Sequence, residues 1–306
     1  MNKITRILLL LIALLLLITA FLVYYLIIRE PESTNNRDSV SENTEEQKRL
    51  IVLISMDGMR SDLIGQETPF LSLLLSKPET AYTLDMLTIE QSETMPSHVS
   101  MVTGLSQEHH GFYANSVDET TTPLTSETIF DYAMEEDYAY YAFLTKEKLL
   151  YLLGEKSGLS IGYQDDYSGG VLDDIDTMVE PSTSSALVFV HFRDIDTYGH
   201  MYGWNSDEQK QAVTTLDSNV EALVADFRVE FSDYARYFVF TADHGGEGTQ
   251  HSNGCAACRR IPLIVVSENS EKKYELDRSD YNIYDVTCAV LDLMDAAEHE
   301  NLDCVR

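Results

Sequence analysis

The chain has 306 residues, of which 44% are hydrophobic, so it is long enough to bury the core of one large α/β domain. Its 21 Lys and Arg against 51 Asp and Glu give a formal net charge of −30. This balance argues against a nucleic-acid-binding protein, because phosphate backbones are bound by clustered basic side chains. An acidic protein can still act on an anionic substrate when bound metal cations dominate the local field.

An uncharged apolar run occupies residues 7–28, near the N-terminus. It contains 22 residues, mostly Leu and Ile, which is long enough to cross a bilayer as a helix. Lys3 and Arg6 precede it, so the positive-inside tendency predicts a cytoplasmic segment over residues 1–6. A bulky residue two positions before Ala20 makes a poor cleavage site for a signal peptidase. We therefore expect an uncleaved signal anchor, with the rest of the chain outside the cytoplasm at the cell membrane.

The composition changes after this run. Residues 29–49 are mainly polar and charged, with little apolar surface to bury, which predicts a tether. A catalytic domain is expected over residues 50–306. Its four cysteines lie late in the chain, and an exported domain can pair them in three ways. Free thiols and a redox pair remain alternatives for Cys255 and Cys258, but a structural disulfide is the preferred interpretation of that motif.

Strand and helix signals alternate from residue 50 onward, which predicts a mostly parallel central sheet with helices on both faces. Apolar, β-rich runs predict strands over residues 50–55, 139–145, 185–192, 237–242 and 261–266. The first, third and fourth of these strands each run directly into a segment that carries Asp or His beside Gly. Ligands of open α/β sheets gather at the carboxyl ends of the strands, so we expect these three endings to converge.

The clearest helix is predicted over residues 207–227, after a capping box formed by Ser206 and Gln209. Apolar residues recur on one face of this segment at helical spacing. They are Val213, Leu216, Val220, Leu223, Val224 and Phe227. Shorter helices are predicted over residues 129–134, 173–179 and 284–294.

Three clusters of Asp and His beside Gly contain the candidate metal ligands. Three carboxylates and three imidazoles can hold two divalent ions with mixed oxygen and nitrogen ligands. Taken alone, a strand-terminal Asp-Gly is weak evidence and is explained more simply by a turn. An Asp and a His four residues apart share an ion only if the loop between them curls. The clusters are Asp57 before Gly58, Asp196 with His200, and Asp243 and His244 followed by His251.

A fourth element offers a hydroxyl nucleophile, Thr94, in the segment Thr94-Met-Pro-Ser-His98. Two cations about 3.5 to 4 Å apart can bind both the attacking and the leaving oxygen of an in-line displacement. A hydroxyl bound to one of them loses its proton near neutral pH, whereas an isolated Thr does not. The combination predicts phosphoryl-transfer chemistry.

Four motifs occur in an order that is characteristic of one known family. They are Ser-Met-Asp57-Gly-Met-Arg, Thr94-Met-Pro-Ser-His98 with its continuation to Asn115, Asp196-Thr-Tyr-Gly-His200, and Ala-Asp243-His244-Gly-Gly. The chain resembles the type I phosphodiesterases, the nucleotide pyrophosphatase/phosphodiesterase family of the alkaline phosphatase superfamily. The resemblance covers about residues 50–266 and implies an alkaline phosphatase-like fold. Met95 and Ser97 stand where that family commonly has Phe and Asn, so the lining of the substrate pocket is expected to differ.

The resemblance also implies two divalent metal ions, with zinc expected at both positions. The first ion would activate Thr94, which would also be its ligand. The second would bind the leaving oxygen and then the hydrolytic water. The protein ligands would be Asp57, Asp243 and His244 for the first ion and Asp196, His200 and His251 for the second.

Two further roles follow from the resemblance. Thr94 would be the nucleophile that becomes transiently phosphorylated, and Asn115 would donate its side-chain amide to a phosphoryl oxygen. Among the other histidines, His98, His109 and His110 are expected to be structural or exposed. His191 is expected to be a satisfied core group or a group that supports a metal ligand.

The predicted function is that of a membrane-anchored, extracytoplasmic hydrolase of phosphodiester or pyrophosphate bonds in small substrates, nucleotides or lipid headgroups. The segment Thr94-x-Pro96-x-His98 excludes sulfatase chemistry, which in this superfamily requires Cys or Ser in a C/S-x-P-x-R motif. The neutral Asn115 favours a diester over a phosphomonoester, which stays open as an alternative. The main rival is a transferase of phospho-headgroups at the membrane surface. Residues 118–127 and 150–170 are expected to contact the substrate alcohol.

Overall fold

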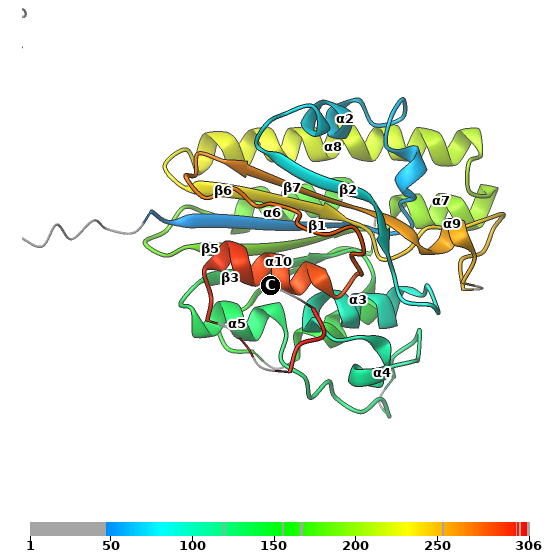
Figure 1. Ribbon diagram of the computed structural model, residues 1–306, viewed down its shortest axis with the longest axis horizontal. Helices are drawn as coiled ribbons and strands as arrows, with labels where there is room; N and C mark the ends of the chain where they lie inside the picture. Colours follow the sequence, from blue (N-terminus) through cyan, green and yellow to red (C-terminus); the bar gives the residue numbers. More distant parts are fainter. Residues whose placement is uncertain are drawn as a thin grey trace, which may run out of the picture. The chain divides into compact units, whose positions relative to one another are not determined.

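The computed structural model describes residues 47–304, except residues 119, 155, 166–167, 253, 298 and 300. The predicted anchor over residues 7–28 and most of the predicted tether lie outside the described residues. Among the helices of the described part, none combines the length and the apolar character that a bilayer crossing requires. The described residues form one α/β unit around a central sheet (Figure 1).

Seven strands form the central sheet. They are β1 (Arg49–Met56), β2 (Thr80–Leu87), β3 (Ala139–Leu144), β4 (Ser160–Tyr163), β5 (Ala186–Phe192), β6 (Ala235–Thr241) and β7 (Arg260–Glu268). Their order across the sheet is β2-β7-β6-β1-β5-β3-β4. Strand β7 is antiparallel to both of its neighbours, and every other neighbouring pair is parallel. The mostly parallel sheet predicted from the alternating pattern is therefore confirmed.

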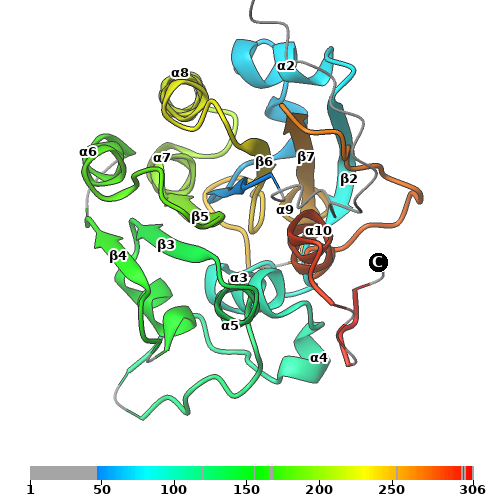
Figure 2. The ribbon, with the colours of Figure 1, turned by 90° about the vertical axis from the view of Figure 1, so that its left-hand side faces the viewer.

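Helices cover both faces of this sheet (Figure 2). One face carries α2 (Pro69–Leu75), α6 (Ser168–Met178), α7 (Asp194–Tyr202) and α8 (Asp207–Glu230). The other carries α3 (Thr94–Thr103), α5 (Ile129–Glu135) and α10 (Asp285–Met294), with the short α4 (Gln107–His110) beside α3. Three further helices lie in connections: η1 (Ser61–Leu63), η2 (Glu147–Leu153) and α9 (Ala256–Arg259).

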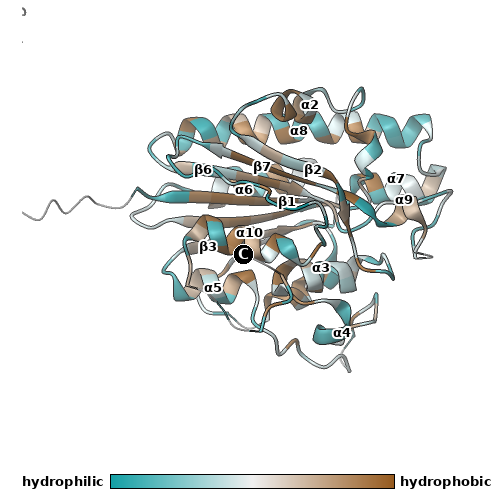
Figure 3. Ribbon diagram, viewed as in Figure 1, coloured by the Kyte–Doolittle hydropathy of each residue, from teal (hydrophilic) through white to brown (hydrophobic). Residues whose placement is uncertain are grey.

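The core lies between the sheet and these two helical layers. The strands are mainly apolar, whereas α8 alternates apolar and polar stretches around its circumference (Figure 3). All six apolar residues predicted to share one face of α8 are buried, each at most 3% exposed. The Ser206 side chain accepts a hydrogen bond from the Gln209 N–H, so the predicted helix start is also confirmed. Burial of this face, rather than helix propensity, stabilises such a long helix.

The register of the sheet aligns three strand endings. Strand β1 lies between β5 and β6, and Ser55 near its end is paired with His191 on β5 and with Thr241 on β6. The expected convergence of these endings is therefore confirmed. Strand β2 was not predicted, because its register shifts between Thr83 and Met86 and its burial does not alternate regularly.

The four cysteines form two disulfide bonds. Cys255 is bonded to Cys258 across the start of α9, and Cys288 on α10 is bonded to Cys304 near the C-terminus. The structure thus selects one of the three pairings that the sequence allowed, and it agrees with the structural disulfide preferred for Cys255 and Cys258.

Candidate active site

The carboxyl ends of β1 and β6 bring one group of metal-ligating side chains together. Asp57 follows β1, Asp243 and His244 follow β6, and all three side chains are fully buried. His244 Nε2 lies 3.5 Å from Asp57 Oδ1 and 3.3 Å from Asp243 Oδ2. Gly58, with a φ of 80°, turns the chain directly after Asp57, and its N–H donates to Asp243 Oδ1 at 3.1 Å. We call Asp57, Asp243 and His244 the buried group.

Helix α7 and the loop after β6 bring a second group together. Asp196 and His200 both lie on α7, where a spacing of four residues places them on one face. The structure thus has a helix where a curled loop was expected. Asp196 Oδ1 lies 3.4 Å from His200 Nε2 and 3.7 Å from His251 Nε2. The His200 side chain is 41% exposed, and we therefore call Asp196, His200 and His251 the open group.

The two groups are neighbours. The rings of His244 and His251, one from each group, stack with their centroids 3.7 Å apart. Among the described residues, three carboxylate oxygens of the two groups are buried without a hydrogen-bond partner: Asp57 Oδ1, Asp196 Oδ1 and Asp243 Oδ2. Because buried polar atoms are ordinarily satisfied, these three oxygens fit the donor set of bound cations.

The three histidines of the two groups present the same nitrogen. The Nδ1 atoms of His200, His244 and His251 donate to the backbone carbonyls of Thr249 (2.9 Å), Gly245 (2.9 Å) and Ser92 (2.7 Å). A carbonyl only accepts, so Nδ1 carries the proton and Nε2 keeps its lone pair. Metal-ligating histidines characteristically donate their other ring N–H in this way. All six side chains therefore present oxygen or nitrogen atoms that could hold divalent metal ions.

The N-terminus of α3 brings the predicted nucleophile to the buried group. Thr94 is 1% exposed, and its Oγ1 lies 3.4 Å from His244 Nε2. Asn115 lies beside it, because Asn115 Oδ1 accepts from the Met95 N–H at 3.1 Å. Asn115 Oδ1 also accepts from Lys148 Nζ at 2.9 Å. With this oxygen engaged, the amide nitrogen is the atom left to donate to a substrate.

Two lysines that the sequence analysis did not select also belong to the site. Lys146 and Lys148 follow β3 and lie at the start of η2. Lys146 Nζ lies 2.5 Å from Asp57 Oδ2 and 2.7 Å from Asp196 Oδ2, so it bridges the two groups. Burial acts to lower the pKa of Lys146, but the attraction of Asp57 and Asp196 outweighs it and raises that pKa above its ordinary value. The side chain is therefore a charged ammonium. Both lysines lie directly after the strand predicted over residues 139–145, and this position was the sequence signal that could have identified them as site residues.

Two more histidines contact the residues of the buried group or the nucleophile. His191 Nε2 lies 3.0 Å from Asp57 Oδ2. His98 is fully buried, with Nε2 2.9 Å from Ser55 Oγ and Nδ1 2.8 Å from the Thr94 carbonyl oxygen. Burial lowers the pKa of both imidazoles, which are therefore neutral. By contrast, His109 is exposed and paired with Asp303, and His110 is half-buried against Ser100.

The carboxylates differ in their protonation. Burial and the nearby Asp57 raise the pKa of Asp243 well above its ordinary value. Burial also acts to raise the pKa of Asp57, but Lys146 and His191 outweigh it and hold that pKa well below its ordinary value. Protons and the Lys146 ammonium therefore share the neutralisation of these buried charges, a task that divalent cations would take over.

The residues of this site fall inside one recognised family pattern. The profile of the family described as type I phosphodiesterase / nucleotide pyrophosphatase matches residues 51–261. That range includes both groups, Thr94, Asn115 and the two lysines. The chain belongs to the type I phosphodiesterase/nucleotide pyrophosphatase family. The resemblance inferred from the motifs is confirmed.

Curated relatives include a transferase and a hydrolase. The chain is 33% identical to GPI ethanolamine phosphate transferase 1 of Candida glabrata over 97 residues, which are 31% of this chain and 10% of the relative. It is 23% identical to bis(5'-adenosyl)-triphosphatase of Mus musculus over 266 residues, which are 78% of this chain and 52% of the relative. The chain thus spans about half the length, or less, of these relatives.

Solved structures support the fold. The C-terminal periplasmic domain of EcEptC from Escherichia coli, in complex with zinc, is similar to this chain with a TM-score of 0.65 and 14% sequence identity. The similarity covers 84% of this chain and 85% of that domain. At this identity the likeness shows the fold alone, and the fold of this protein is alkaline phosphatase-like.

Proposed function

We propose that the protein is a two-zinc hydrolase that cleaves phosphodiester or pyrophosphate bonds in small substrates through a phosphorylated Thr94. The observation that carries the proposal is the position of the Thr94 hydroxyl, 3.4 Å from His244 Nε2 in the buried group. Family membership supports the reaction class. The triphosphatase relative supports nucleotides as one substrate class, and the transferase relative supports phospho-headgroups as another.

The reaction has two halves. When bound, the two cations would supply positive charge at the attacking and leaving oxygens. Thr94 Oγ1 attacks the phosphorus atom in line with the leaving oxygen. A bond from phosphorus to Oγ1 replaces the bond to the leaving alcohol or phosphate, and the proton of the Thr94 hydroxyl ends on the leaving oxygen. Asn115 donates its amide to a non-bridging oxygen. Water then attacks the phosphorus of phosphorylated Thr94, the bond from phosphorus to Oγ1 breaks, and a proton of the water restores the Thr94 hydroxyl.

The charge of the pocket qualifies the expected preference for diesters. Asn115 alone is neutral and suits the single negative charge of a diester. However, Lys148 lies against Asn115, so positive charge is available beside Asn115 for a second negative charge, whereas the charge of Lys146 is engaged with Asp57 and Asp196. The preference for diester or pyrophosphate substrates therefore rests on the family and on the triphosphatase relative.

The second candidate is a phospho-headgroup transferase. It is favoured by the local identity of 33% to GPI ethanolamine phosphate transferase 1. The first half-reaction is of the same kind, because Thr94 takes the phosphoryl unit of the substrate in both cases. The acceptor in the second half is then an alcohol instead of water. The two candidates differ only in the group that removes the phosphoryl unit from Thr94.

We also propose that residues 7–28 anchor the protein in the cell membrane, that residues 29–49 form a tether, and that the domain over residues 50–306 is extracytoplasmic. The two disulfide bonds support an exported location, because disulfides persist in oxidising compartments.

The decisive experiment uses the full chain, purified in detergent and loaded with zinc. kcat/KM is compared for bis-p-nitrophenyl phosphate and p-nitrophenyl phosphate. A diester preference of about tenfold or more, equivalent to about 1.4 kcal/mol of transition-state stabilisation, is expected. Ethanolamine and glycerol are then added as acceptors, and transfer of the phosphoryl unit to them in excess of hydrolysis would favour the transferase.

The nucleophile is tested in the same assay. Thr94→Ala is expected to abolish turnover while zinc content stays unchanged, because Ala keeps the helix and removes only the attacking oxygen. Thr103→Ala is the matched control, since Thr103 is buried at the other end of α3 and its hydroxyl donates to the Val99 carbonyl. Activity of Thr94→Ala comparable to that of Thr103→Ala would overturn the assignment.

A further inference from the structure

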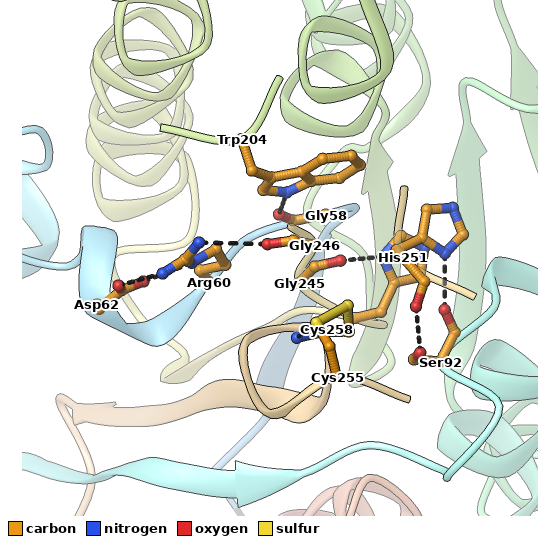
Figure 4. The surroundings of a disulfide bond; sticks show 11 residues. Gly58, Arg60, Asp62, Ser92, Trp204, Gly245, Gly246, His251, Cys255 and Cys258 are labelled. Atoms are coloured by element: carbon orange, nitrogen blue, oxygen red, sulfur yellow. Dashed lines mark hydrogen bonds and ion pairs between the residues drawn. A yellow bond between two sulfur atoms is a disulfide. The ribbon is translucent and has the colours of Figure 1, made fainter. Parts of the chain in front are cut away.

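Trp204 lies where the segments that carry both metal-ligating groups meet. It is the only tryptophan of the chain, is 6% exposed and follows α7 after Gly203. Figure 4 shows its indole ring above Gly58 and beside Gly246. Neither the motifs nor the proposed chemistry gives this residue a role.

The indole N–H connects Trp204 to the buried group. Trp204 Nε1 donates to the Gly58 carbonyl oxygen at 3.0 Å, and the bond is buried. Gly58 directly follows Asp57, and its own N–H donates to Asp243 Oδ1. The Trp204 hydrogen bond therefore fixes the turn that orients two of the three ligands of the buried group.

The indole ring also requires two glycines. A Cβ at Gly199 would lie 2.7 Å from the nearest ring atom of Trp204, and a Cβ at Gly246 would lie 2.2 Å from the same atom, Cε2. Any side chain at either position would therefore displace the ring. Gly199 lies between Asp196 and His200 on α7, and Gly246 lies two residues after His244. One ring thus fixes the separation between the helix of the open group and the loop that follows the buried group.

Two ligands of the open group pack against the same ring. The His200 ring lies 5.3 Å from the Trp204 ring at an interplanar angle of 81°, and the His251 ring lies 6.0 Å away at 70°. Both geometries are edge-to-face, which is favourable for aromatic pairs. In addition, the backbone N–H of Trp204 donates to the Gly248 carbonyl at 2.7 Å, which ties the residue that carries the ring to the loop between His244 and His251.

We propose that Trp204 is a positioning residue that sets the spacing between the two metal-ligating groups. The proposal rests on the proposed function in one respect, that both groups bind metal. Two-metal displacement needs cations about 3.5 to 4 Å apart, and a misplacement of about 1 Å costs roughly 10²-fold in rate. A rigid, buried ring in contact with the segments of both groups keeps that spacing constant when exposed side chains move.

The test measures zinc binding directly. The full chain in detergent is titrated with Zn²⁺ against a chromophoric chelator, for the wild type, Trp204→Phe and Trp204→Leu. Trp204→Phe keeps an aromatic ring and removes the N–H, and Trp204→Leu also removes the edge-to-face contacts. The wild type is expected to bind two zinc ions. Both variants are expected to bind the weaker ion about 10- to 100-fold less tightly, the range found when groups that orient metal ligands are removed.

The matched control is Tyr234→Phe, which removes the hydroxyl that donates to the Ser182 carbonyl at 2.7 Å, beyond the amino ends of the strands. Its zinc affinity is expected to equal that of the wild type. Melting temperatures in excess chelator separate positioning from general stability. Trp204→Phe removes a buried hydrogen bond and is therefore expected to lower the melting temperature to some extent without metal, and clearly more with zinc. An equal decrease in both conditions would overturn the proposal.

A third variant changes a residue that packs against the ring instead of the ring itself. Gly199→Ala leaves Trp204 unchanged but places a methyl group against it, and is expected to weaken zinc binding as Trp204→Phe does. Tryptophan emission provides an independent signal, because paramagnetic Co²⁺ bound at His200 and His251 is expected to quench the single Trp204. A wild type that binds no metal would refute the proposed function itself. Two bound ions in the wild type and in all three site variants, at equal affinity, would refute only the role of Trp204.

Discussion

The two metal-ligating groups use the same ligand types but differ in their access to solvent. The side chains of Asp57, Asp243 and His244 are fully buried, whereas the His200 side chain in the open group is 41% exposed. The difference follows from their positions, since the buried group lies at the ends of central strands and the open group lies on α7 and a surface loop. A buried ligand set retains its ion and keeps the nucleophile dry, whereas an open one admits substrate and water.

Lys146 makes the comparison sharper, because it contacts one carboxylate of each group. Its ammonium supplies the charge that a cation would otherwise supply to Asp57 and Asp196. The two groups are therefore coupled through one side chain, although their accessibility differs. Variants that separate the groups should show which of them holds the catalytic ion and which exchanges.

The largest effect is expected from ligands of the buried group. Asp243→Ala should lower kcat/KM for bis-p-nitrophenyl phosphate by at least about 10³-fold, because a bound cation supplies several kcal/mol of transition-state stabilisation. Steady-state kinetics measures the loss of kcat/KM in Asp243→Ala.

His251→Ala, in the open group, should reduce the zinc content below two ions per chain and leave the buried ion in place. Metal analysis after gel filtration measures the zinc content of His251→Ala. If His251→Ala lost both ions, the two groups would have to be treated as one site.

An intermediate effect is expected from Lys146→Met, measured by urea unfolding. In excess chelator the free energy of unfolding should fall by about 3 to 5 kcal/mol, because Asp57 and Asp196 lose the counter-charge of a buried ion pair. In excess zinc the loss should be smaller, since the cations supply that charge. Lys148→Met is the control, because Lys148 contacts the neutral Asn115. An equal loss with and without zinc would contradict the coupling.

The smallest effect is expected from pH. Burial, with a contribution from His244, lowers the pKa of His251 from its ordinary value of 6.5 to about 4. Between these values the unfolded chain binds a proton at His251 that the folded chain does not, so the stability of the metal-free protein falls as the pH falls. His251→Gln should reduce this slope between pH 6.5 and pH 4. An unchanged slope would show that His251 is already protonated in the fold.

The sequence was sufficient to predict the residues that converge at the strand ends. Asp57 and Asp243 each follow an apolar, β-rich run, and parallel strands bring their carboxyl ends to one edge. Thr94 was selected as a hydroxyl nucleophile from its segment, whereas Asn115 was selected by family resemblance alone. The Asn115 side chain accepts from the backbone N–H of the residue after Thr94. The relation between Asp196 and His200 was predicted only in part, because the glycine between them suggested a loop and the chain forms a helix.

Other parts of the site depend on contacts between distant segments. Lys146 lies in a Lys-Glu-Lys sequence that is typical of a solvated turn, and only its proximity to Asp57 and Asp196 gives it a role. Trp204 contacts Gly246, and nothing in either local sequence predicts that one ring lies against both Gly199 and Gly246. His98 was expected to be either structural or exposed. Every residue of α3 is buried, so the helix has no exposed polar face, and its sequence pattern could not decide between these two alternatives. Periodicity cannot supply such information.

The position of β1 has a consequence for the biogenesis of the protein. This strand is the first of the sheet to be synthesised, yet it lies in the middle of the sheet. The N–H of Gly58, next to Asp57, donates to Asp243, which is synthesised 185 residues later. Until β5 and β6 have emerged, both edges of β1 are unpaired and open to association with other chains. The nascent chain therefore needs protection until β5 and β6 have been synthesised, and the buried group can bind metal only in the finished domain, because Asp243 and His244 follow β6.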